Sequence, residues 1–169
     1  KNSTFVSKGF YSEQAMTKFY FTLLAVMCSL LVQSQPQTVA EKSNFESTAY
    51  EKDVWGFIGE ISKNPAKIKV QTMSISTEGR KVPLLIIADP MIQSSQQLAA
   101  DPRMVLYIQA NIHAGEVEGK EATLMFAREL LSGTKKDLLK NVIFLICPNF
   151  NPDGNEAIST QNRTHQNGP

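Results

Sequence analysis

The chain has 169 residues, 42% of them hydrophobic, and a formal net charge of +1. That size and composition indicate one globular domain. The nearly balanced charge argues against a nucleic-acid partner, because such proteins usually present a strongly basic surface.

The start of the chain has the pattern of a segment that is removed from the mature protein. Residues 19–32 are apolar, follow a lysine and precede a polar stretch, which is typical of a secretory signal that starts at Met16. We expect cleavage after Ser34, so that residues 16–34 are the signal peptide and residues 1–15 are upstream read-through. A single membrane anchor is the alternative, although the run is short for a span. The mature protein is then secreted or periplasmic, without stable insertion in the membrane.

The next part of the chain predicts a linker, a helix and a β-hairpin. Residues 35–46 are polar and irregular, as in a linker. From Ser47 to Ile61, apolar side chains recur at three- and four-residue steps, which predicts an amphipathic helix. Two runs, 68–77 and 82–88, alternate between apolar and polar and are separated by a turn with glycine. They predict a hairpin whose first strand changes register near Met73.

A strand, a helix and a second strand follow. A polar loop, with a helical turn near residues 96–100, leads to an apolar strand from Met104 to Ile112. The broad apolar face from Val117 to Leu131 predicts a helix. The apolar run Asn141 to Cys147 is the next strand, so the unit predicts a crossover between parallel strands. Cys147 is expected to be a small buried core residue rather than a nucleophile.

The main candidate for a functional site is His113 with Glu116, where the strand from Met104 runs into the helix. Strand ends in α/β proteins meet at one rim of the sheet, where these proteins keep their sites. A neutral imidazole and a carboxylate are two of the three protein ligands that a catalytic zinc usually takes. Gly115 between them permits a sharp turn. Glu121, further along the helix, is expected on a solvated face rather than at a metal.

Two more features support a cleft at this rim, although each alone could be an ordinary turn or a solvated surface residue. Asn151 to Gly154 is a tight-turn sequence that follows the next strand, and in a parallel sheet it emerges beside His113. About ten residues further along the chain lies Arg163, whose guanidinium suits a developing oxyanion or a carboxylate.

In this order and spacing the chain resembles the zinc carboxypeptidase family, the carboxypeptidase A-like peptidases. The resemblance covers roughly Ser47 to His165, and it includes the hairpin turn Glu78–Arg80, the pair His113 and Glu116, and the turn Asn151–Gly154. It implies an α/β fold of three layers, α/β/α, with a mixed, mostly parallel, doubly wound sheet that is incomplete in this chain. It also implies Zn²⁺ as cofactor, a zinc-activated water as nucleophile, and peptide or protein substrates cut at the carboxyl end.

Carried over by position, His113 and Glu116 resemble the family's first two metal ligands. Residues 47–169 are then the amino-terminal part of the catalytic domain of an exported metallocarboxypeptidase. The third ligand, the Asn-Arg pair that grips the substrate carboxylate and the catalytic Glu are expected beyond Pro169. This part alone is therefore expected to be inactive.

The chain departs from the family pattern at two positions. Gly115 stands where many members carry an Arg that contacts substrate. The Arg that polarises the substrate carbonyl would fall on Gln166, so Arg163 is assigned that role through a shifted loop. The other histidine, His165, is too near the preceding turn to match the third ligand.

Two other functions would use the same residues. A zinc-dependent deacylase of N-acyl amino acids has the same pair of ligands, but a signal peptide argues against an enzyme expected in the cytoplasm. A non-catalytic carboxypeptidase-like binding module would keep the fold without the later catalytic residues. The downstream sequence would distinguish these three hypotheses.

Overall fold

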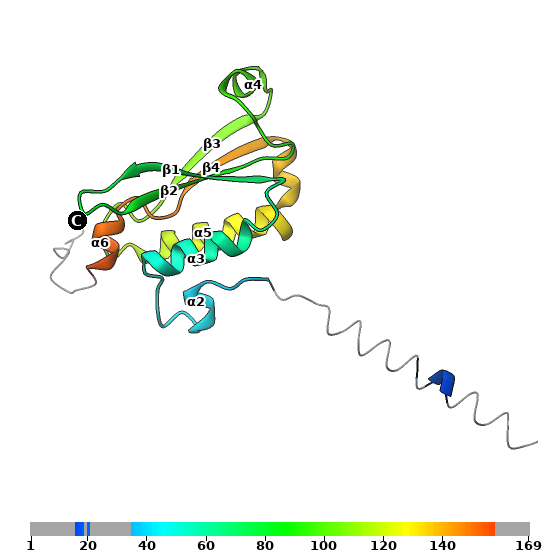
Figure 1. The fold of residues 1–169 in the computed structure, drawn as a ribbon, viewed down its shortest axis with the longest axis horizontal. Coiled ribbons are helices and arrows are strands. Elements are labelled where there is room, and N and C mark those ends of the chain that lie inside the picture. Colours follow the sequence, from blue (N-terminus) through cyan, green and yellow to red (C-terminus); the bar gives the residue numbers. More distant parts are fainter. Residues whose placement is uncertain (1–15, 19, 21–34, 158–169) are drawn as a thin grey trace, which may run out of the picture. The chain divides into compact units, whose positions relative to one another are not determined.

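The computed structural model describes residues 16–18, 20 and 35–157, and Figure 1 shows their fold. The chain forms two compact units, residues 1–35 and 36–169. The predicted signal core and its cleavage point lie largely outside the described residues. Among the residues that are described, no helix is long and apolar enough to cross a membrane.

The second unit is built on one four-stranded sheet in the order β1-β2-β4-β3. Its strands are β1 (Ile68–Ile75), β2 (Lys81–Ile87), β3 (Met104–Gln109) and β4 (Val142–Cys147). β2 is antiparallel to both β1 and β4, whereas β3 and β4 are parallel. The predicted hairpin and the predicted parallel crossover are both present, and the expected α/β fold with a mixed sheet is confirmed.

The hairpin has the irregularity that the sequence pattern predicted. The register between β1 and β2 shifts between Thr72 and Ser74, which is the position of a β-bulge. The turn that follows contains Gly79 at a φ of +84°, a conformation that glycine adopts without strain. The change of alternation near Met73 is therefore a bulge within one strand and not a break between two.

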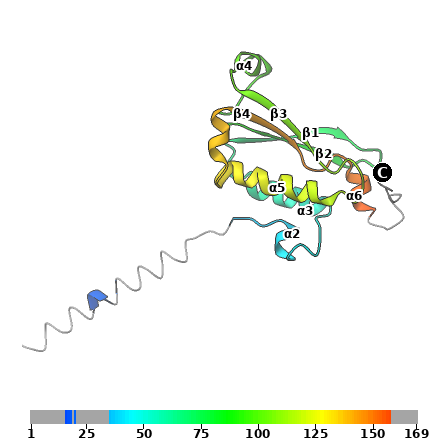
Figure 2. The same ribbon diagram turned by 180° about the vertical axis from the view of Figure 1, so that it is seen from behind.

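Two long helices cover one face of the sheet. α3 (Glu51–Ile61) and α5 (Val117–Ser132) lie side by side beneath the strands (Figures 1 and 2). Their apolar stripes meet the inward side chains of the strands in one core, whose fully buried members include Val54, Leu85, Ile87, Leu124, Leu130 and Ile146. Burial of one such side chain contributes about 1.5–3 kcal/mol. The core therefore fixes α5, which begins beside the predicted site.

The other face of the sheet is more open in the described part of the chain. Leu84, Ile86 and Leu145 on this face are half-buried, whereas Leu85, Ile87 and Ile146 on the helix-covered face are fully buried. Two of the three strand pairings are antiparallel, and both long helices lie on one face. The sheet of residues 36–157 is thus open and incomplete, as the sequence analysis expected for this part of the family's fold.

Several short elements differ from the sequence prediction. The predicted linker contains the helix α2 (Val39–Lys42), and the predicted helix from Ser47 starts later, at Glu51. The helix starts later because the amide and the carbonyl of Ala49 are both bonded to side chains of α5. The helical turn predicted near residues 96–100, by contrast, is confirmed as the helix α4 (Ser95–Ala100). A 3₁₀ helix, η1 (Lys136–Lys140), leads into β4.

An ion pair attaches α2 to α5. Glu41 accepts hydrogen bonds from Arg128 at 2.7 and 2.9 Å, and the two side chains are 17% and 9% exposed. Glu41 also accepts from the backbone amide of Thr38 at 2.8 Å, which closes a capping box. The hydrogen bond from Arg128 is the main reason why the pKa of Glu41 lies below its usual value.

Replacing Glu41 by Gln tests this attachment through the pH dependence of stability. Because the folded pKa is depressed, the stability from this carboxylate is present above the unfolded pKa and lost as pH falls through the folded pKa. At neutral pH, Glu41→Gln should therefore lower the free energy of unfolding by about 1–2 kcal/mol. The difference from the unchanged protein should shrink on acidification, measured by urea unfolding from pH 7 to pH 3. Glu46→Gln, at an exposed position, is the matched control. A difference that does not change with pH would contradict the account.

Candidate metal site

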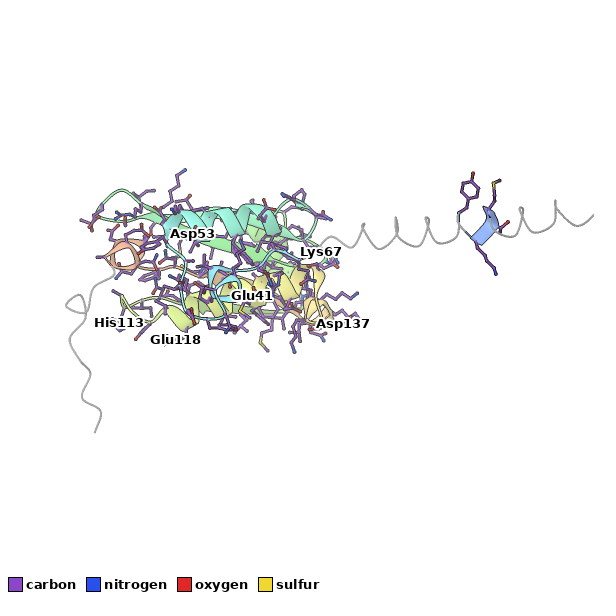
Figure 3. The ribbon with its side chains drawn as sticks, turned by 90° about the horizontal axis from the view of Figure 1, so that it is seen from below. Glu41, Asp53, Lys67, His113, Glu118 and Asp137 are labelled. Carbon is purple, nitrogen blue, oxygen red and sulfur yellow. The ribbon has the colours of Figure 1, made fainter. Side chains whose placement is uncertain are left out.

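His113 and Glu116 lie together at the rim of the sheet, just after β3. The Nδ1 atom of His113 is 3.1 Å from Oε1 of Glu116. Their side chains are 59% and 42% exposed, so both head groups can be reached from solvent. Figure 3 shows His113 at the end of the second unit where α5 begins, with Glu118 nearby on the helix. The structure brings the two predicted ligands together.

The turn between the two residues directs Glu116 toward His113. The amide of Glu116 donates to the carbonyl of His113 at 3.2 Å, and Gly115 has a φ of +90°. Glu116 is the N-cap residue of α5, yet its side chain makes no capping hydrogen bond. A carboxylate at this position usually accepts from the first amides of its helix. Here the side chain is directed to the imidazole instead, as a ligand pair requires.

The segment that leads to His113 is bonded to the loop after β4. The amide of Phe150 donates to the carbonyl of Ala110, and the amide of Asn151 to that of Asn111, both at 3.1 Å. The side-chain amide of Asn151 donates to the carbonyl of Ile112 at 3.2 Å. These three bonds continue the parallel pairing of β3 and β4 beyond the sheet. They confirm that the turn at Asn151 emerges on the same rim as His113.

The predicted turn is a short helix rather than a loop. α6 (Pro152–Glu156) begins with proline in its first turn, and the Asn151 side chain accepts from the amide of Gly154 at 3.0 Å. A Cβ atom at Gly154 would lie 3.2 Å from the Cβ of Ala114. Glycine therefore allows α6 to pack closely against the segment between the two candidate ligands. The sequence contained this signal, since asparagine followed by proline is also a helix start.

Asp153 on α6 holds the hairpin turn of β1 and β2. Its carboxylate accepts from the hydroxyl of Ser76 at 2.7 Å, from the amide of Glu78 at 3.1 Å and from the guanidinium of Arg80 at 2.7 Å. Burial raises the pKa of Asp153, but the hydrogen bonds from Arg80, Ser76 and Glu78 outweigh this and leave it below the usual value. The Glu78–Arg80 turn and the turn after β4 thus form one structural unit.

Two charged residues in the first turns of α5 are buried, although no local sequence pattern indicates it. Glu121, expected on a solvated face, is 6% exposed and accepts from the Thr48 hydroxyl at 2.8 Å and the Ala49 amide at 2.6 Å. That expectation was wrong, because residues 48 and 49 fold across the helix start. Lys120 is fully buried. Burial lowers the pKa of its ammonium, and the carboxylates of Glu121 and Glu156 oppose this shift.

A groove of about 420 Å³ runs beside the candidate ligands. Its walls come from the end of β3, the segment after it and the first turns of α5. Glu116 lines it, together with Asn111. The Oδ1 atom of Asn111 is buried and has no hydrogen-bond partner in the described part of the chain. The carboxylate of the candidate pair therefore borders a concave surface.

The profile of the zinc carboxypeptidase family matches residues 57–168 of this chain. That is most of the chain, and it contains both candidate ligands and the turn at Asn151. The chain therefore belongs to the zinc carboxypeptidase family. A comparison with curated protein sequences gives no match.

Solved structures of carboxypeptidases share the fold. Carboxypeptidase A from Helicoverpa armigera is 22% identical with a TM-score of 0.56, and the match covers 83% of this chain and 32% of that one. Bovine thrombin-activatable fibrinolysis inhibitor, in complex with a tick carboxypeptidase inhibitor, is 21% identical with a TM-score of 0.53, covering 64% and 33%. A metallo-carboxypeptidase from Burkholderia cenocepacia is 24% identical with a TM-score of 0.53, covering 63% and 28%. The match thus spans about a third of the length of these structures.

The family implies zinc, and the chemistry of the pair fits that ion. Zinc takes imidazole nitrogen and carboxylate oxygen at about 2.0–2.2 Å, so two neighbouring ligands in a tetrahedral arrangement lie roughly 3.4 Å apart. The Nδ1 atom of His113 and Oε1 of Glu116, at 3.1 Å, are close to that separation. Within residues 35–157, no group of three or more His, Cys, Asp or Glu side chains could hold a metal. The pair therefore offers two ligands. Arg163 lies outside the described residues, and its catalytic role stays a prediction.

Replacing Gly115 by Ala tests the turn between the ligands. No atom lies within 4 Å of a Cβ built at Gly115, so the expected penalty comes from its φ of +90° alone. Gly115→Ala should lower the free energy of unfolding by about 1–2 kcal/mol. Gly59→Ala, on the exposed side of α3 with equal space around it, is the matched control and should raise stability by about 0.5–1 kcal/mol. Equal effects in urea unfolding would show that the turn does not depend on glycine.

Proposed function

We propose that this chain forms the amino-terminal part of the catalytic domain of an exported zinc metallocarboxypeptidase, which hydrolyses peptides at their carboxyl end. The observation that carries the proposal is the 3.1 Å pairing of His113 with Glu116 at the carboxyl rim of the sheet. Family membership over residues 57–168 supports it. The apolar segment 19–32, with a lysine before it, supports export and a secreted or periplasmic location.

Each residue of the site has a defined part in this function. His113 and Glu116 would hold the metal, and the chemistry that zinc would supply there is polarisation of the substrate carbonyl and activation of a water as nucleophile. Gly115 turns the chain so that both ligands reach one point. Arg163 assists at the substrate carbonyl, where a guanidinium stabilises developing negative charge. The third ligand and the catalytic carboxylate come from the remaining two thirds of the family's fold.

Zinc titration of the purified chain tests the ligand assignment. A catalytic zinc usually has three protein ligands, so a site of two should bind the ion weakly but measurably. His113→Ala and Glu116→Gln should each abolish the calorimetric signal, because each removes one of the two ligands. Glu118→Gln, an exposed acid two residues further on, is the matched control and should bind as the unchanged chain does.

Two outcomes would contradict the assignment. Tight zinc binding would mean that more than two side chains hold the ion. Unchanged binding by Glu116→Gln would remove Glu116 from the site, and with it the rim pair that supports the peptidase function.

A further inference from the structure

Lys120 is a buried lysine one helical turn after Glu116. Its side chain has no exposed surface, and its ammonium donates to the carbonyl of Ala49 and to Oδ1 of Asn155, the latter at 2.5 Å. Burying an ammonium is costly unless its hydrogen bonds are made, and an apolar side chain of similar size is often as stable. Ala49 lies in the loop before α3, whereas Asn155 lies in α6. Lys120 therefore joins parts of the chain that no regular element connects.

The bonds of Lys120 extend to the segment that carries His113. Asn155 Oδ1 also accepts from the side-chain amide of Asn111 at 3.1 Å, and the same amide donates to Oδ1 of Asn149 at 2.8 Å. Asn111 lies two residues before His113 and has a φ of +56°. Lys120, Asn155, Asn111 and Asn149 are named the buried polar network from here on. It connects α5, α6 and the ends of β3 and β4 beneath the rim.

The packing indicates that Lys120 is not needed to satisfy its acceptors. Asn155 Oδ1 retains the donor from Asn111 if the ammonium is removed. The carbonyl of Ala49 likewise retains the side-chain amide of Asn155, at 3.2 Å. An apolar replacement would therefore leave neither acceptor without a hydrogen bond. The replacement would remove the link from α5, which begins at the metal pair, to α6 and to the loop before α3.

We propose that Lys120 is a positioning residue for the metal pair, which it fixes through Asn155 and Asn111. The proposal rests on the proposed function, since the pair must hold a metal for its position to matter. The ammonium ties the start of α5, and with it Glu116, to α6. Asn111 ties the segment before His113 to the same point. His113 and Glu116 then approach each other from the segment after β3 and from the start of α5, both of which are bonded to Asn155.

Lys120→Met removes the charge and keeps the apolar volume, so it tests the proposal directly. Zinc binding is followed by the NMR shift of the His113 ring, and amide hydrogen exchange is followed at Phe150 and Asn151, whose bonds close the rim. We expect zinc affinity to fall by about tenfold or more, as for other residues that orient metal ligands. The two amides should exchange about tenfold faster. The amide of Ala88, bonded to the Lys67 carbonyl far from the network in sequence, should be unchanged.

Two further variants sharpen the experiment. Lys52→Met removes an exposed lysine on α3 and should leave both measurements unchanged. Asn111→Gly removes the side chain that bonds the segment before His113 to Asn155, and glycine tolerates the positive φ at this position. It should reproduce the effects of Lys120→Met, and it decides the question if Lys120→Met does not fold.

The outcomes separate this proposal from the function on which it rests. A folded Lys120→Met or Asn111→Gly variant with unchanged zinc affinity, or with unchanged exchange at Phe150 and Asn151, overturns the positioning role. If the unchanged chain binds no zinc, the proposed function fails separately. The exchange rates alone then decide whether Lys120 holds the rim.

Discussion

Because β3 and β4 run parallel and side by side, the segments that follow them leave the sheet at the same rim. Every feature of the candidate site depends on this pairing. It places the loop before α5 against the loop before α6, and three hydrogen bonds continue the pairing from Ala110 to Ile112 beyond the last strand residues. If β4 were antiparallel to β3, α6 would lie at the opposite end of the sheet. His113 would then lack the support of Asn151.

The turn between His113 and Glu116 depends on the backbone conformation at Gly115. A side chain at Gly115 would have open space around it, but the backbone there adopts a left-handed conformation that favours glycine. An arginine at this position would thus require a different turn or a strained one. The glycine at position 115 is therefore explained by the backbone, which leaves Glu116 directed toward His113.

Much of the fold could be predicted from the sequence because it is recorded in local patterns. The alternation in the two strands of the hairpin, the apolar face of α5 and the order of strand, helix and strand each depend on neighbouring residues. The change of alternation at Met73 even marked the bulge. The pair His113 and Glu116 could be found for the same reason, since its two members are three residues apart.

The parts that could not be predicted depend on contacts between distant segments. Glu121 is a typical acid for the first turns of a helix, and nothing near it in the sequence indicates that Thr48 and Ala49 lie across it. Lys120 is equally ordinary in its local context. The late start of α3 at Glu51 has the same origin, because Ala49 is bonded to α5 instead of joining its own helix. The helix faces can thus be predicted from neighbouring residues, whereas the burial of Lys120 and Glu121 depends on contacts with distant segments.

The bonds that Ala49 accepts from Lys120 and Asn155 join residues 71 and 106 positions apart in the chain. Contacts of such long range form late in folding, since a large loop must close before they contribute any stability. The hairpin and α5, by contrast, are built from near neighbours and can form early. A partly folded molecule could therefore hold its helix and hairpin while the rim is still unformed. The two proposed ligands would then reach their final positions only in chains that have completed their folding.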